Sequence, residues 1–124
     1  MDWDGIGRDS LDAARRSYGL HARSTVSRAY YAAHSVLTRA LVDAGYRMAA
    51  NRQTPPHAAQ PNLIGLHLAS RGQRFVQELR ARVRRLYAAR LDADYNQRVT
   101  MDNRVSLQAI RDAYSIFLML EVRP

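Results

Sequence analysis

Residues 90–95, with the sequence RLDADY, bring together side chains whose chemistry suits anion binding or proton transfer. They are an arginine (Arg90), a carboxylate one helical turn later (Asp94) and a phenol beside it (Tyr95). A guanidinium forms two parallel hydrogen bonds to a phosphate or a carboxylate, and a phenol donates to the same oxygens. The segment therefore predicts either a phosphate site around Arg90 or an internal ion pair between Arg90 and Asp94.

The pattern upstream of this segment indicates where Arg90 points. Apolar residues recur there at three- and four-residue steps, which predicts an amphipathic helix over residues 73–91. These residues are Phe75, Val76, Leu79, Val83, Leu86 and Tyr87. Arg90 continues the row, and a buried ion without partners costs several kcal/mol, on the order of a quarter of a small domain's stability. Arg90 must therefore face a ligand or join a structural polar network with Asp94 and the tyrosines Tyr30, Tyr31 and Tyr95.

The composition favours one domain that spans residues 1–124 and lies in the cytoplasm. A chain of 124 residues is long enough for one packed core, and the absence of cysteine excludes disulfides and thiolate metal sites. The first residues carry acid at Asp2 and Asp4 where a secretory signal carries base, and no apolar run is long enough to span a bilayer. We expect no membrane partner.

The charge of the chain suggests a phosphate-bearing partner. Arginines account for all 19 basic residues, against 11 acidic ones, and give a formal charge of +8. The guanidinium of arginine forms two hydrogen bonds to phosphate oxygens and stacks on bases, so RNA or a nucleotide is the expected partner. Among the arginines of the basic helix, Arg82 and Arg85 are the candidates to bind phosphate together with Arg90. The alternatives are a solvated surface and a coding bias toward arginine.

Helical spacing and the absence of period-two alternation predict an all-α fold. The expected helices run from Ser10 to Gly19, from Ser24 or Thr25 to Gly45, over 62–70, over 73–91, and onward from Thr100 or Asp102. A proline-containing loop is expected at about residues 46–61, since prolines interrupt helices there. Together these elements predict an antiparallel four- to five-helix bundle.

Two motifs in this order, SRAYYAA at residues 27–33 and LYAARLDADY at 86–95, resemble those of the HEPN (higher eukaryotes and prokaryotes nucleotide-binding) domain family. The resemblance covers roughly residues 11–120 and implies a helical bundle, commonly a homodimer. Family members are often metal-independent ribonucleases. Many are toxins or defence effectors partnered by a small nucleotidyltransferase antitoxin.

The chain departs from the family pattern at one position. In the family an arginine and a histidine, four to six residues apart, line a cleft between two protomers. Arg90 matches that arginine, and Tyr95 stands where the histidine is expected, so the catalytic motif is degenerate. A phenol with a pKa of about 10 is a far weaker general base near neutral pH than an imidazole with a pKa of about 6.5. Tyr95 is better suited to hold a phosphate or to stack on a base.

The histidines offer one alternative to this interpretation. Arg52 and His57 repeat the arginine-histidine spacing inside the proline-containing loop; we interpret this as coincidence, and a catalytic role for His57 is the alternative. His34 is expected at the edge of the core or in a dimer interface, where Tyr31 would join it. His67 is expected to be packed. No histidine and carboxylate spacing fits a metal site, so we expect no metal and no cofactor.

These observations predict a HEPN-type protein that binds RNA or a nucleotide and belongs to a prokaryotic toxin-antitoxin or defence system. One alternative is an active metal-independent endoribonuclease, in which Arg90 stabilises the phosphorane and Tyr95 or His57 handles a proton. A second alternative is a dimerisation module without a ligand.

Overall fold

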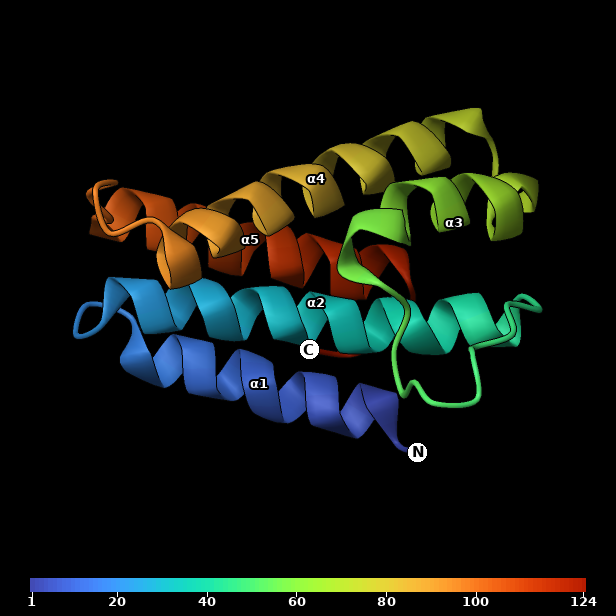
Figure 1. Cartoon of the computed structure of the whole chain (residues 1–124), viewed down its shortest axis with the longest axis horizontal. Coiled ribbons are helices and arrows are strands. Elements are labelled where there is room, and N and C mark those ends of the chain that lie inside the picture. Colours follow the sequence, from blue (N-terminus) through green and yellow to red (C-terminus); the bar gives the residue numbers. More distant parts are fainter.

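Five α-helices pack together in the computed structural model, which describes all 124 residues and contains no strand (Figure 1). The helices are α1 (Trp3–Ser17), α2 (Ala22–Asp43), α3 (Gln60–His67), α4 (Gln73–Tyr95) and α5 (Asn103–Met119). The prediction of an all-α helical bundle is confirmed. None of the helices is both long enough and apolar enough to cross a membrane.

The first helix begins a full two turns before the predicted start at Ser10. Its N-terminus is capped by Asp2, whose carboxylate accepts a hydrogen bond of 2.9 Å from the backbone of Gly5. Gly7 then faces α2 so closely that an added Cβ would lie 2.8 Å from Val36 Cγ1. The predicted start was wrong because the glycines in this segment have low helix propensity and argue against a helix there. In the structure, the lack of a side chain at Gly7 allows α1 to pack closely against α2.

Helix α2 forms the centre of the bundle and is buried on most of its circumference, with α1 on one side and α4 and α5 on the other (Figure 1). Neither Ser24 nor Thr25 caps it, contrary to the prediction, since the helix begins at Ala22. The Thr25 hydroxyl instead bonds to the His21 carbonyl at 2.9 Å and pairs with Ser17 at 2.7 Å. The helix ends at Asp43, close to the predicted Gly45, whose φ of +104° suits glycine.

The loop after α2 is shorter than the predicted span of residues 46–61. A single turn of 3₁₀ helix at His57–Ala59 leads directly into α3, and Pro61 lies in the first turn of that helix. Proline is tolerated there because the first turn has no intrahelical acceptor for its missing N–H. The chain passes back across α2 through this loop (Figure 1). His57 then contacts Tyr30 of α2, and Gln60, the first residue of α3, contacts His34 of α2.

Helix α4 extends one turn beyond the predicted end at Leu91, so that Arg90, Asp94 and Tyr95 all lie on one continuous helix. Asp102 caps α5 by accepting from the backbone N–H groups of Arg104 and Val105, both at 3.0 Å. Of the two predicted caps, Asp102 is the one used. The α1–α2 turn and the α4–α5 turn lie at the same end of the bundle (left in Figure 1).

Candidate functional site

Arg90 lies at the end of the apolar row of α4 and is only 7% exposed. Three tyrosine rings surround its guanidinium: its Cζ atom lies 5.5 Å from the ring centre of Tyr30, 5.3 Å from that of Tyr31 and 5.2 Å from that of Tyr95. The faces of these rings carry partial negative charge, which stabilises a cation that has lost most of its water. The inward orientation predicted for Arg90 is thus found in the structure.

The hydrogen bonds of Arg90 are incomplete. Its Nη2 atom donates to the hydroxyl oxygens of Tyr31, at 2.7 Å, and Tyr95, at 3.3 Å. Its Nε atom lies 2.9 Å from Asp94 Oδ2, but the N–H does not point at that oxygen, so the ion pair lacks an aligned hydrogen bond. The remaining nitrogen, Nη1, makes no hydrogen bond within the protein and is not fully buried. Arg90 therefore retains donor capacity for an external acceptor.

The surroundings of Arg90 keep it charged. Burial lowers its pKa, but the combined interactions with Tyr31, Tyr95 and Asp94 outweigh burial and raise the pKa above the ordinary arginine value. A guanidinium is protonated at any physiological pH even without this effect. The site thus holds a permanent cation.

An open pocket of about 820 Å³ adjoins Arg90. Its lining residues on α2 and α4 lie in the first half of α2 and the last turns of α4. It is lined by residues from α1, α2 and α4: Ser10, Arg23, Ser24, Ser27, Arg28, Tyr31, Arg90, Ala93, Asp94 and Tyr95. Three of these side chains are arginines and one is a carboxylate, so the lining is cationic. Hydroxyl groups supply most of the other polar atoms.

Arg23 was not predicted to belong to the site, and it holds the last turn of α4 in place. Its Nη1 atom donates to the carbonyl oxygens of Asp92 at 2.8 Å, Ala93 at 3.1 Å and Asn96 at 3.1 Å. Its Nη2 atom donates to the carbonyl of Val99. A cation at a helix C-terminus satisfies carbonyls that have no intrahelical partner and interacts favourably with the helix dipole. Arg23 thereby positions the helical turn that carries Asp94 and Tyr95.

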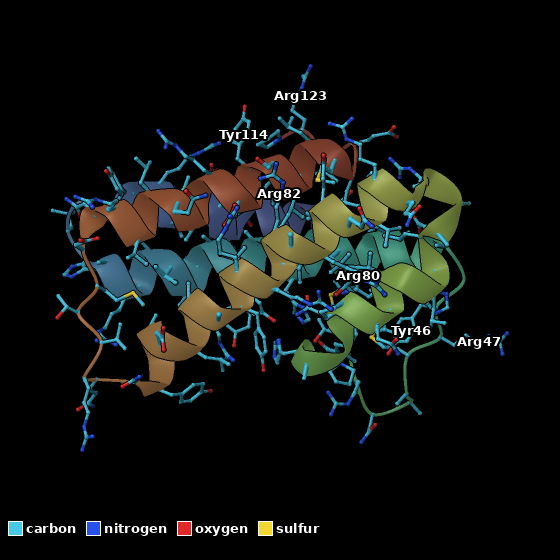
Figure 2. The ribbon with its side chains drawn as sticks, turned by 90° about the horizontal axis from the view of Figure 1, so that it is seen from above. Tyr46, Arg47, Arg80, Arg82, Tyr114 and Arg123 are labelled. Atoms are coloured by element: carbon cyan, nitrogen blue, oxygen red, sulfur yellow. The ribbon has the colours of Figure 1, made fainter.

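Arg82 and Arg85 do not line this pocket, which corrects the expectation that they act together with Arg90. Arg85 forms a bidentate pair with Asp112 of α5, at 2.8 and 2.6 Å, and Arg82 Nη1 lies 3.8 Å from the same carboxylate. Figure 2 shows Arg82 between α4 and α5, while Arg80 lies toward α3. Asp112 is 1% exposed and needs these partners.

Tyr30 lies in the core as predicted, but its partner is not Tyr95. Its ring is 1% exposed and packs edge-to-face on Tyr31, with the ring centres 5.3 Å apart. Its hydroxyl contacts His57 Nδ1 at 2.6 Å and Gln60 Nε2 at 2.7 Å. Burial raises the pKa of Tyr30, so this phenol is neutral. Tyr95 instead is 71% exposed at the mouth of the pocket.

The structure places two histidines beside this aromatic group. His34 is 3% exposed in the core, and its ring centre lies 4.5 Å from that of His57. Burial lowers the pKa of His34 to about 4, and a hydrogen bond from its Nδ1 to Gln60 opposes this effect only in part. His57 is partly exposed, and the loop holds its ring 5.9 Å from that of Tyr31. His67 is partly buried against Tyr46.

No group of three or more histidine, cysteine or carboxylate side chains is arranged to hold a metal ion. Comparisons of the chain with family models, with curated proteins and with solved structures find no match.

Proposed function

We propose that this chain is a HEPN-type protein that binds RNA or a nucleotide, with a phosphate group held in the pocket beside Arg90. The observation that carries the proposal is the incomplete coordination of a nearly buried cation. Arg90 is held by Tyr31, Tyr95 and Asp94, yet Nη1 has no partner in the protein. An anion in the pocket would supply the missing acceptor.

The two phenols beside Arg90 add further donors. Each hydroxyl oxygen accepts a hydrogen bond from Nη2, and the proton of Tyr31 or Tyr95 has no acceptor within the protein. A hydroxyl that accepts from a cation is free to donate its own proton to a third group. Tyr31, Tyr95 and Arg90 all line the pocket and together have several N–H and O–H donors without a partner in the protein. A phosphate, with several acceptor oxygens, suits such a set.

The remaining lining of the pocket favours a nucleic-acid phosphate over a small inorganic anion. Arg28 is exposed and has no partner in the protein, so it can follow a charged backbone. The exposed ring of Tyr95 provides a surface on which a base can stack. Asp94 would disfavour anions that approach without such contacts.

The two segments that carry the resemblance to the HEPN family both contribute to this pocket, which supports the proposed family. Ser27, Arg28 and Tyr31 come from the first segment, and Arg90 and Tyr95 come from the second. A homodimer, a small nucleotidyltransferase antitoxin and a place in a prokaryotic toxin-antitoxin or defence system follow from the resemblance as parts of the same proposal.

RNA binding by wild-type protein and by Arg90→Ala tests this function directly. We expect the variant to lose at least about tenfold in affinity for a 5′-phosphorylated single-stranded RNA, since charge-assisted hydrogen bonds contribute about 1.5–3 kcal/mol. Arg111→Ala is the matched control, because Arg111 is exposed on α5 outside the pocket. If Arg90→Ala does not fold, Arg90→Lys is used instead. Lysine keeps the positive charge but cannot form the two parallel hydrogen bonds of a guanidinium.

The salt dependence of the RNA affinity shows whether binding depends on phosphate contacts. Binding through phosphates requires log K to fall with log salt, with a slope of about −0.7 per phosphate contact for a single strand. A flat dependence, or equal affinities of wild type and Arg90→Ala, would show the proposal to be wrong. Cleavage of the same RNA in the presence of a chelator, abolished by Arg90→Ala, would favour the endoribonuclease alternative.

A further inference from the structure

The side-chain amide of Gln60 has only one orientation that fits its neighbours. Gln60 is 1% exposed at the start of α3, and one end of its amide lies 2.9 Å from the His57 carbonyl oxygen and 2.7 Å from the Tyr30 hydroxyl. A carbonyl oxygen only accepts, so this end must be the NH₂ group. The amide oxygen is then the atom 2.9 Å from His34 Nδ1, and that ring nitrogen must carry a proton.

The same orientation fixes the protonation of His57. The Tyr30 hydroxyl accepts from Gln60 and is buried, so its own proton requires an acceptor. The one available is His57 Nδ1, at 2.6 Å. That nitrogen must therefore be unprotonated, and the neutral His57 ring carries its proton on Nε2. A chain of hydrogen bonds runs from Gln60 through Tyr30 to His57.

The Nε2 atom of His57 has no partner in the protein and is not fully buried, so this N–H is available to an external acceptor. Burial lowers the pKa of His57, and the positive charges of Arg90 and Arg52 lower it further, so the ring stays neutral near pH 7. The ring also lies edge-on to Tyr31, which lines the pocket beside Arg90. An uncharged donor is thus held in a defined tautomer next to a cationic pocket.

We propose that His57 is a second contact for the RNA, and that its Nε2–H donates to a phosphate or ribose oxygen adjacent to the phosphate held at Arg90. This inference rests on the proposed function. Tyr30 and Gln60 are positioning residues, which act by fixing the tautomer of His57. In this tautomer Nε2 already has its proton and cannot accept another, so His57 recognises the ligand and does not serve as the general base.

Nitrogen-15 NMR of the histidine rings tests the positioning step without any ligand. We expect His57 to show an unprotonated Nδ1 and a protonated Nε2 in the wild type. In Tyr30→Phe the donor to Nδ1 is lost, so the ring should populate both tautomers, while His67 serves as an internal control that does not change. A protonated Nδ1 on neutral His57 in the wild type would overturn the inference.

Binding of two probes, inorganic phosphate and a 5′-phosphorylated dinucleotide, tests the contact itself. We expect His57→Ala to weaken dinucleotide binding about three- to tenfold, as for one neutral hydrogen bond, and to leave phosphate binding unchanged. His57→Gln places an amide N–H near the former Nε2 position and should restore part of the affinity. His67→Ala, at a histidine that packs on Tyr46 and does not line the pocket, should bind both probes like the wild type.

The outcomes separate the two proposals. If the wild type binds both probes and Arg90→Ala loses both, but His57→Ala binds the dinucleotide normally, the contact by His57 is wrong and the proposed function stands. If the wild type binds neither probe, the proposed function is wrong, and so is the proposed contact between His57 and the RNA.

Discussion

The hydroxyl oxygen of Tyr31 on α2 accepts a hydrogen bond of 2.7 Å from Nη2 of Arg90 on α4. The two residues are 59 positions apart in the chain, Tyr31 in the motif at residues 27–33 and Arg90 in the motif at residues 86–95. Because Tyr31 is 37% exposed and Arg90 only 7%, the phenol forms the boundary between a buried cation and the pocket. The contact orients the guanidinium and leaves the phenolic proton free.

Replacement of Tyr31 by phenylalanine should weaken phosphate binding while preserving the fold. The variant loses one acceptor for Arg90 and one donor to the anion, so we expect an affinity about three- to tenfold lower, measured by NMR titration with inorganic phosphate. Its free energy of unfolding should change by less than about 1.5 kcal/mol, because water can reach the site. Tyr114→Phe, at a similarly exposed ring on α5, is the control. An unchanged phosphate affinity in Tyr31→Phe would show that the Tyr31 hydroxyl does not contact the anion.

Replacement of Arg85 by alanine should affect stability and leave RNA affinity unchanged. Asp112 is buried, and without Arg85 it keeps only Gln108 at 3.2 Å and Arg82 at 3.8 Å. We expect urea denaturation to show a loss of about 1–2 kcal/mol, below the range for fully buried pairs because Arg85 itself is half exposed. Arg84→Ala, at an exposed neighbouring position without a partner, removes the same charge and should be neutral. A loss of RNA affinity in Arg85→Ala but not in Arg84→Ala would show that Arg85 contacts the RNA.

Replacement of Gly7 by alanine should destabilise the protein although alanine is the better helix former. The added methyl group would lie 2.8 Å from Val36 Cγ1 and 3.0 Å from the Ala32 carbonyl oxygen, and that backbone atom cannot move independently of α2. Overpacking costs about 1–3 kcal/mol, against a gain of about 1 kcal/mol in helix propensity. Thermal denaturation should give a lower Tm than for the wild type. An exposed substitution on the same helix, Arg8→Ala, should not lower it.

Apolar periodicity predicted the parts of the fold that are buried along their length. Many apolar residues repeat at helical spacing in α2, α4 and α5, and this spacing predicts all three helices. Side-chain chemistry narrows the cap of α5 to Thr100 or Asp102, and the structure uses Asp102. The first two turns of α1 were missed, since Gly7 is favoured there only by its distance to α2. Local sequence carries no information about that distance.

The candidate site was predictable where its residues lie on one helix and unpredictable where they come from several. Arg90 and Asp94 are one turn apart on α4, so their proximity follows from spacing alone. Arg23 contacts the end of α4 some 70 positions later, and Gln60 meets His34 only because of the path of the loop. The sequence shows the charges of Arg82 and Arg85, but their pairing with Asp112 depends on how α4 faces α5.

The buried ring of His34 should make the protein less stable in acid. Unfolded His34 takes up a proton near pH 6.5, whereas in the folded protein its pKa is about 4 because burial disfavours the charged ring. A protonated ring would also carry an N–H at Nε2, which has no partner. Between these two values the unfolded chain binds more protons. The free energy of unfolding should therefore fall as the pH drops from about 6.5 to about 4, and this group contributes no pH dependence above that range.

The expected loss from His34 is about 3 kcal/mol across this range, at about 1.4 kcal/mol per pKa unit. His57 acts in the same direction, since its pKa is lowered as well. Urea denaturation at a series of pH values measures the effect, and His34→Asn provides the reference, because an amide can replace the Nδ1 donor to Gln60 without titrating. Acidic side chains titrate in both proteins and cancel in the difference. Equal pH dependence of the wild type and His34→Asn would show that His34 does not remain neutral in the folded core.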